Sequence, residues 1–143
     1  MWLLLAAITA HWRNLTLYHR WWCWIPASVF FGTGLALYRL SSTGFSQAQL
    51  GGLPEILPGH RQRLVTTGIR AHVRHPVYLA HLCEMLAWST GTGLTVCWML
   101  TALAIVTGAA MITLEDNELE NRFGEEYRRY RMSVPAILPK TKL

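Results

Sequence analysis

The sequence predicts an all-α integral membrane protein, a helical bundle of three to four transmembrane helices with a cytosolic amphipathic C-terminal helix. Three observations predict this fold class. Hydrophobic residues make up 52% of the 143 residues and charged residues only 15%, which favours a chain with much surface in lipid. Seven tryptophans are many for this length, and tryptophan is enriched at membrane interfaces. The net charge of +5 comes from residues flanking apolar segments, which indicates cytoplasmic retention and no nucleic-acid partner.

The N-terminal region, residues 1–39, contains two apolar segments. Residues 2–18 have no basic residue before the apolar run, so we expect them to be retained and not cleaved as a signal peptide. The uninterrupted part is short for a span, because a helix rises ~1.5 Å per residue against ~30 Å of hydrocarbon. This segment therefore either spans with its polar end in the headgroups or lies at the interface. Its interrupting residues are His11, Arg13 and Asn14.

Residues 21–38 form a clearer span, bracketed by Arg20 and Arg39. Small residues four apart predict a face for close contact with another helix, either within the bundle or between protomers. These residues are Ser28, Gly32 and Ala36. The next region, residues 40–76, is polar and rich in glycine and proline, which predicts a long cytosolic loop.

Residues 77–114 are apolar and too long for one helix, so we expect a transmembrane hairpin that turns near residues 90–93. Both ends of a hairpin lie on one side, which places the 40–76 loop and the 115–143 tail together. Because 11 of the 13 Lys and Arg residues follow residue 38, that side is predicted to be cytoplasmic. The tail predicts one amphipathic helix through Arg131, with a stripe made of Leu119, Phe123, Tyr127 and Tyr130.

The chemistry-bearing residues lie at the two ends of this hairpin. Arg74 and His75 precede Pro76, which is typical of a first helical turn. Four side chains then share one helical face and are expected to face the bundle interior or a wet cavity, since polar groups avoid lipid. They are Tyr78, His81, Glu84 and Trp88. The alternative is that His81 and Glu84 only pair with each other or with a neighbouring helix.

At the other end of the hairpin, Glu115 and Asp116 are predicted to lie close to Arg74 and His75. This juxtaposition is either a structural ion pair or a site for a zwitterion, in which carboxylates bind an ammonium or ribose hydroxyls. The cysteines have neither CxxC spacing nor a histidine pattern, so no disulfide framework and no metal site are expected. They are Cys23, Cys83 and Cys97.

Two stretches, "LVTTGIRAHVRHPVYLAHL" and "EDNELENRFGEEYRRYRMSVPAILP", resemble the isoprenylcysteine carboxyl methyltransferase and phospholipid methyltransferase family, especially its small prokaryotic members. The resemblance implies an S-adenosylmethionine-dependent methyltransferase in the membrane with a lipophilic acceptor. It also implies cofactor binding by Arg74, His75, Tyr78, Glu115 and Asp116. The expected role of Trp88, Tyr127 and Tyr130 is substrate contact or closure of the site.

The expected catalytic residues are His81 and Glu84, which could serve as the base for an amine or thiol acceptor, whereas a carboxylate acceptor needs none. The chain departs from the family in having Ala80 after the RHPxYL motif and Met111 where several relatives have an arginine. If that arginine positions the acceptor, this chain has a different acceptor or no activity. Two alternatives follow: an NAD(P)H-dependent membrane reductase related to sterol reductases, or a non-catalytic membrane scaffold.

Overall fold

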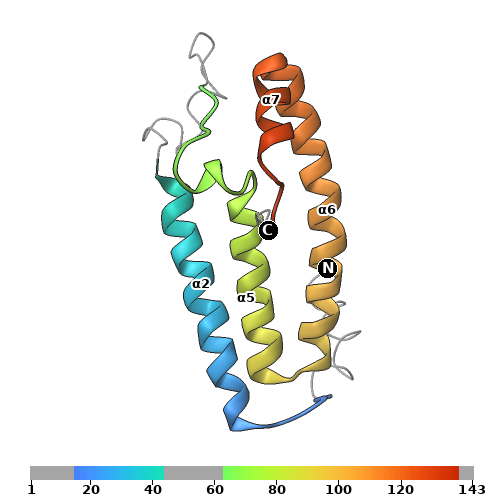
Figure 1. Ribbon diagram of the computed structural model, residues 1–143. Coiled ribbons are helices and arrows are strands. Elements are labelled where there is room, and N and C mark those ends of the chain that lie inside the picture. Colours follow the sequence, from blue (N-terminus) through green and yellow to red (C-terminus); the bar gives the residue numbers. More distant parts are fainter. Residues whose placement is uncertain (1–14, 44–62, 139–143) are drawn as a thin grey trace, which may run out of the picture. The chain divides into compact units, whose positions relative to one another are not determined.

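The computed structural model describes residues 15–43 and 63–138, and over these residues the chain is helical (Figure 1). The only strand-like pairing in this part is an isolated bridge between Thr16 and Leu94. The all-α prediction is therefore confirmed. The predictions for residues 1–14, 44–62 and 139–143 lie outside the described residues. The elements are η1 (Trp21–Cys23), α2 (Trp24–Ser42), η2 (Gly68–Ala71), α5 (Pro76–Thr92), α6 (Thr95–Phe123) and α7 (Glu125–Ser133).

The chain divides into two compact units. The first contains residues up to Leu35 together with Ala80–Ala110, and the second contains Ala36–Leu79 together with the residues from Met111 onward. The helices α2, α5 and α6 each contribute residues to both units. The two sets of candidate site residues fall into different units, so each unit is described by itself.

The first unit contains the predicted turn between α5 and α6 (Figure 1). Gly93 has φ +65°, a left-handed conformation that favours glycine. A Cβ atom there would lie 2.2 Å from the backbone oxygen of Tyr18, so the turn also requires glycine for space. The Leu17 N–H donates to the Gly93 carbonyl at 2.8 Å. The turn predicted near residues 90–93 is confirmed; that both helices cross a membrane stays a prediction.

Small residues form the contact between α2 and α5 in the first unit. A Cβ on Gly34 would lie 3.1 Å from the Ala80 carbonyl oxygen, which shows how closely the two backbones approach. Ser28, Gly32 and Ala36 do not form this contact among the described residues, because they are exposed and a Cβ on Gly32 would have nothing within 4 Å. That this face contacts another protomer stays a prediction. The buried small residues of this unit include Cys23, Ala27, Gly34, Ala80, Cys83, Ala87, Ser89 and Gly91.

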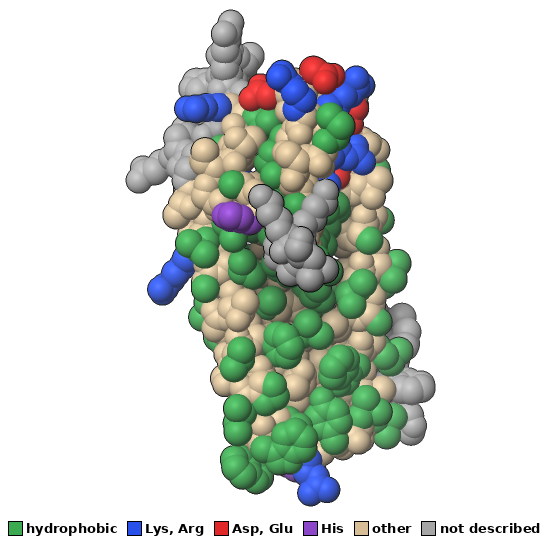
Figure 2. All heavy atoms as spheres, viewed as in Figure 1, with side chains coloured by type: hydrophobic (Ala, Val, Ile, Leu, Met, Phe, Trp, Pro, Cys, Tyr) green, Lys and Arg blue, Asp and Glu red, His purple; other side chains and the backbone are tan. Residues whose placement is uncertain are grey.

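Among the described helices, α6 alone is long and apolar enough to cross a membrane. Only 11% of its most apolar window is buried, whereas the core helix of a soluble protein is mostly buried. Figure 2 shows many hydrophobic side chains at the surface and charged ones gathered over α7. Such an exposed apolar surface is typical of contact with lipid or with another protein. Exposed residues on α6 include Leu100, Leu103, Ile105 and Val106.

In the second unit, α6 continues past the predicted boundary at residue 114 and ends at Phe123. Gly124 then has φ +59°, and α7 folds back beside the end of α6 (Figure 1). The prediction of one tail helix through Arg131 is therefore wrong. Its apolar stripe is divided: Leu119 and Phe123 belong to α6, and the two tyrosines belong to α7.

Candidate functional site

The backbone around Arg74 and His75 is held by the segment that follows α7. The Arg74 N–H donates to the Pro135 carbonyl and the His75 N–H to the Ala136 carbonyl, both at 2.9 Å. The next residue, Pro76, begins α5 as predicted; a first-turn residue needs no N–H donor for the helix. The entrance to α5 is therefore fixed by the C-terminal segment.

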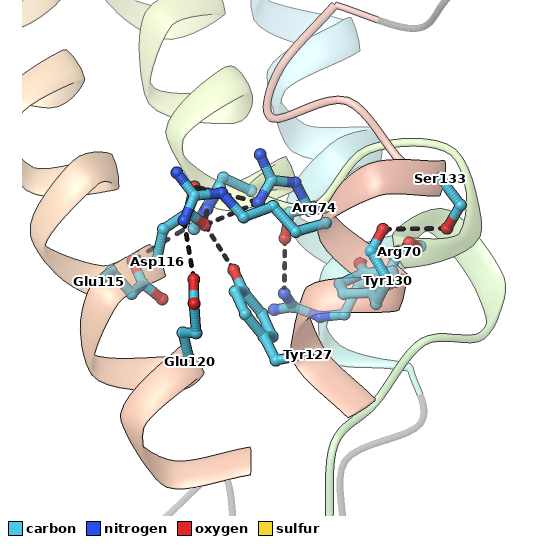
Figure 3. Close-up of polar contacts among 10 residues, drawn as sticks. Arg70, Arg74, Glu115, Asp116, Glu120, Tyr127, Tyr130 and Ser133 are labelled. Atoms are coloured by element: carbon cyan, nitrogen blue, oxygen red, sulfur yellow. Dashed lines mark hydrogen bonds and ion pairs between the residues drawn. The ribbon is translucent and has the colours of Figure 1, made fainter. Parts of the chain in front are cut away.

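The side chains of Arg74, His75, Asp116 and Tyr127 converge in what we call the Asp116 cluster (Figure 3). Arg74 Nη1 donates to both carboxylate oxygens of Asp116, at 2.9 and 3.0 Å. His75 Nε2 lies 2.8 Å from Asp116 Oδ1, and the Tyr127 hydroxyl donates to the same oxygen. The predicted juxtaposition of the two ends of the hairpin is confirmed.

The Asp116 cluster is closed to ligands as it stands, because its groups are buried and bonded to one another. The side chains of Arg74 and Asp116 are only 8% and 5% exposed. Removing one partner of such a buried pair costs about 3–5 kcal/mol, since the other charge is left uncompensated. Arg74 Nε is buried without a hydrogen-bond partner among the described residues. This geometry favours a structural role for the cluster, which holds the start of α5 against α6.

Three titratable groups of the cluster have shifted pKa values: His75, Asp116 and Tyr127. Burial by itself lowers the pKa of His75, but the carboxylates of Glu115 and Asp116 more than offset this and raise it above the usual 6.5. Glu115 Oε2 lies 3.6 Å from His75 Nδ1. Burial and the Asp116 carboxylate raise the pKa of Tyr127 well above its usual value. Tyr127 is therefore a neutral hydrogen-bond donor at physiological pH.

Tyr130 connects α7 to the segment before α5. Its hydroxyl donates to the Arg70 carbonyl at 2.6 Å, and Arg70 Nη1 donates to the Arg74 carbonyl at 3.1 Å. The Tyr130 ring packs edge-on against Tyr127, with ring centroids 5.9 Å apart. Burial lowers the pKa of the Arg70 guanidinium. Both tail tyrosines thus tie α7 to residues 70–75, an arrangement compatible with the predicted role in closure.

A cavity of about 340 Å³ opens beside this cluster in the second unit, within the range of small-molecule sites. Of the predicted cofactor residues, Tyr78 and Glu115 line the cavity, and the Glu115 side chain is 43% exposed. Two further polar residues of the wall, Glu118 and Arg122, were not predicted as site residues. Glu118 and Arg122 follow Glu115 by three and seven residues, so these three side chains lie on one helical face. The apolar lining residues are Met111, Leu114 and Leu119.

The predicted catalytic residues belong to the first unit. His81 is exposed, and Glu84 is half-buried with its Cγ 3.1 Å from a Cβ placed on Gly34. His81 and Trp88 do not face a buried interior among the described residues, because small residues occupy the buried face of α5. The alternative that this polar stripe faces a wet cavity stays a prediction. Trp88 is 57% exposed. It lines an apolar cavity of about 260 Å³ with Trp24, Ala27, Ser28, Phe31 and Ala87.

The chain is similar to proteins that are named as methyltransferases. It is 33% identical to Arabidopsis thaliana protein-S-isoprenylcysteine O-methyltransferase B over 82 residues, which cover 54% of this chain and 40% of that protein. It is 37% identical to the Schizosaccharomyces pombe protein-S-isoprenylcysteine O-methyltransferase over 81 residues, which cover 53% and 33%. The chain thus spans well under half the length of these relatives.

An uncharacterized Haemophilus influenzae protein is 36% identical to the chain over 59 residues, which cover 41% of this chain and 94% of that protein. No family model matches the chain. No solved structure matches it either. Because the match includes nearly the whole Haemophilus protein, the chain belongs to the same family as that protein, with the isoprenylcysteine methyltransferases as distant relatives.

Proposed function

We propose that this chain is an S-adenosylmethionine-dependent methyltransferase that acts on a lipophilic acceptor within the membrane. The observation that carries the proposal is the similarity to proteins named as isoprenylcysteine methyltransferases. The cavity beside Tyr78 and Glu115 supports it, because this cavity contains residues from both sequence stretches that resemble the family.

The residues of this cavity fit the proposed methyl donor. S-adenosylmethionine carries an ammonium, a carboxylate, ribose hydroxyls and a sulfonium, and when bound it supplies a methyl group attached to positively charged sulfur. The half-exposed carboxylate of Glu115 can accept hydrogen bonds from an ammonium or from hydroxyls. The aromatic side chain of Tyr78 provides an apolar surface at the same wall. Tyr78 and Glu115 would hold the donor, while Arg74, His75 and Asp116 hold the helix ends that carry them.

For methyl transfer, the protein mainly has to hold the two reactants in line and exclude water. The apolar cavity that contains Trp88 supports a lipophilic ligand, because its lining offers hydrocarbon and aromatic surface. His81 and Glu84 remain candidate bases for an amine or thiol acceptor, whereas a carboxylate acceptor needs none. The proposal therefore specifies the apolar part of the acceptor and leaves its reacting group open.

We further propose a multi-pass topology, with the 40–76 loop and the C-terminus in the cytoplasm. The exposed apolar surface of α6 supports insertion of this helix, and α5 with 17 residues approaches the length of a span. The basic residues that follow residue 38 support the cytoplasmic orientation. The cofactor cavity would then open at the cytoplasmic interface.

Calorimetric titration of the detergent-solubilised full chain with S-adenosylhomocysteine tests the proposal. We expect binding in the micromolar range and its loss in Glu115→Ala, because Glu115 lines the cavity. Glu125→Ala is the matched control, since Glu125 is an exposed carboxylate on α7 outside the cavity lining. A folded wild-type chain that releases no heat of binding would refute the proposed function.

A further inference from the structure

We propose that Glu118 and Arg122 bind the zwitterionic amino-acid end of the methyl donor. This inference rests on the proposed function and extends its site by two residues that lie outside the RHPxY motif and the acidic pair. It starts from the wall of the cavity in the second unit, where α6 presents both residues.

The wall carries charges of both signs within two helical turns. Arg122 Nη2 donates to Glu118 Oε1 at 2.5 Å, and both residues line the cavity together with Glu115. The three side chains follow one another at positions i, i+3 and i+7, so they share one face of α6. The cavity therefore offers a guanidinium beside two carboxylates.

An α-amino acid has a carboxylate and an ammonium on one carbon atom, which is the charge pattern that this wall complements. A guanidinium binds a carboxylate with two parallel hydrogen bonds, and carboxylates accept hydrogen bonds from an ammonium. A ligand with only negative charge would meet the carboxylates of Glu115 and Glu118, and one with only positive charge would meet Arg122. A zwitterion satisfies all three groups.

The exposure of the ion pairs determines which of them can bind a ligand. The side chains of Arg122 and Glu118 are 37% and 66% exposed, and exposed pairs of this kind are weak because water and salt screen them. Their hydrogen bonds can be exchanged for bonds to a ligand at little cost. Arg74 and Asp116 are buried and fully engaged with each other and with Tyr127. Among the residues that line the cavity, Arg122 therefore carries the guanidinium that can exchange its partner for a ligand.

The lining also suits the uncharged part of such a ligand. Met111, Leu114 and Leu119 contribute apolar surface to the cavity, where methylene groups and a sulfur atom would be in favourable contact. The charged residues and the apolar residues thus form one continuous wall of α6. This arrangement matches an amino-acid end that is joined through methylene groups to sulfur, which is a sulfonium in the methyl donor and a thioether in S-adenosylhomocysteine.

Two probes separate the amino-acid end from the rest of the ligand. S-adenosylhomocysteine contains the amino acid, whereas 5′-methylthioadenosine keeps the nucleoside and the thioether without it. Calorimetry on the full chain in detergent should show that the wild type prefers S-adenosylhomocysteine by about tenfold or more. Arg122→Gln should remove most of this preference and leave the affinity for 5′-methylthioadenosine unchanged.

Glu118→Gln is a second variant and should reduce the same preference, because it removes an acceptor for the ammonium. Arg129→Gln is the matched control: it makes the same change of charge at an exposed residue of α7 outside the cavity lining, and should alter neither affinity. Thermal unfolding of each variant verifies that it is folded.

The outcomes distinguish this inference from the proposed function. If both probes bind and the Glu118 and Arg122 variants keep the wild-type preference, the inference is overturned and the proposed function stands. The inference is likewise overturned, and the proposed function stands, if these variants lower the affinity for both probes equally. If the folded wild type binds neither probe, the proposed function fails and the inference fails with it.

Discussion

Replacing Asp116 by asparagine should destabilise the protein more than removing any one of the groups that donate a hydrogen bond to Asp116. Asp116 accepts two hydrogen bonds from Arg74 and further contacts from His75 and Tyr127, all of them buried. The asparagine variant keeps the size of the side chain but leaves the Arg74 guanidinium buried without its counter-charge. Breaking a buried pair in this way costs about 3–5 kcal/mol.

Tyr127→Phe provides the comparison, because it removes one donor and leaves Asp116 paired with Arg74 and His75. A hydrogen bond to a charged group contributes about 1.5–3 kcal/mol. The loss in the free energy of unfolding should lie near the lower end of this range, because Arg74 and His75 still contact Asp116. Equilibrium unfolding in detergent of the wild type, both single variants and the double variant would measure these costs. The two effects should not add, since both changes act on one carboxylate oxygen.

Glu118→Gln is the control for this experiment, because it removes a carboxylate from an exposed ion pair of the same helix. Its effect on the free energy of unfolding should be small. If Asp116→Asn destabilises the chain no more than Glu118→Gln does, then the Asp116 cluster does not hold α5, α6 and α7 together, and the reasoning from burial is wrong.

The remaining predictions concern pH and two glycines. The pKa of His75 is raised in the folded state, so its stabilising contribution is complete below the unfolded value of about 6.5 and is lost as the pH rises through the higher folded value. The melting temperature of the wild type should therefore fall as the pH rises above about 6.5, and His75→Gln should show a smaller fall; equal falls would contradict this assignment. Gly93→Ala should lower the melting temperature strongly, because the new Cβ would lie 2.2 Å from the Tyr18 backbone oxygen in addition to the strain at φ +65°. Gly124→Ala has open space around the new atom and should cost only the strain of its backbone, about 1–3 kcal/mol; a larger loss than in Gly93→Ala would refute the packing argument.

Part of the fold could be predicted because local signals and helix length determine it. Proline is favoured in a first helical turn, and α5 begins at Pro76. The 38-residue apolar region required a turn, and glycine at position 93 supplies the left-handed conformation. The contact of Arg74 with Asp116 then followed from topology, because a hairpin brings its two ends together.

Other features depend on neighbours that a sequence pattern does not specify. Small residues recur on more than one face of α2, and the face that α5 contacts includes Gly34 and not Gly32. The end of α6 was misplaced because hydropathy falls at Glu115, whereas the helix-forming tendency of the chain continues to Phe123. Glu118 and Arg122 were not predicted as site residues, because helical spacing does not show that a cavity forms beside Glu115.

The different environments of Glu115 and Asp116 determine what a loss of activity can mean. Asp116 is buried in the cluster, so its substitution changes folding before it can report on a ligand. Glu115 is 43% exposed, with His75 3.6 Å away and the cavity beside it, so Glu115→Gln should lose ligand affinity at a smaller cost in stability than Asp116→Asn. Binding and unfolding therefore have to be measured on the same variants. If Glu115→Gln and Asp116→Asn lose binding only in proportion to their loss of stability, Glu115 is a structural residue and the cavity has no carboxylate dedicated to the ligand.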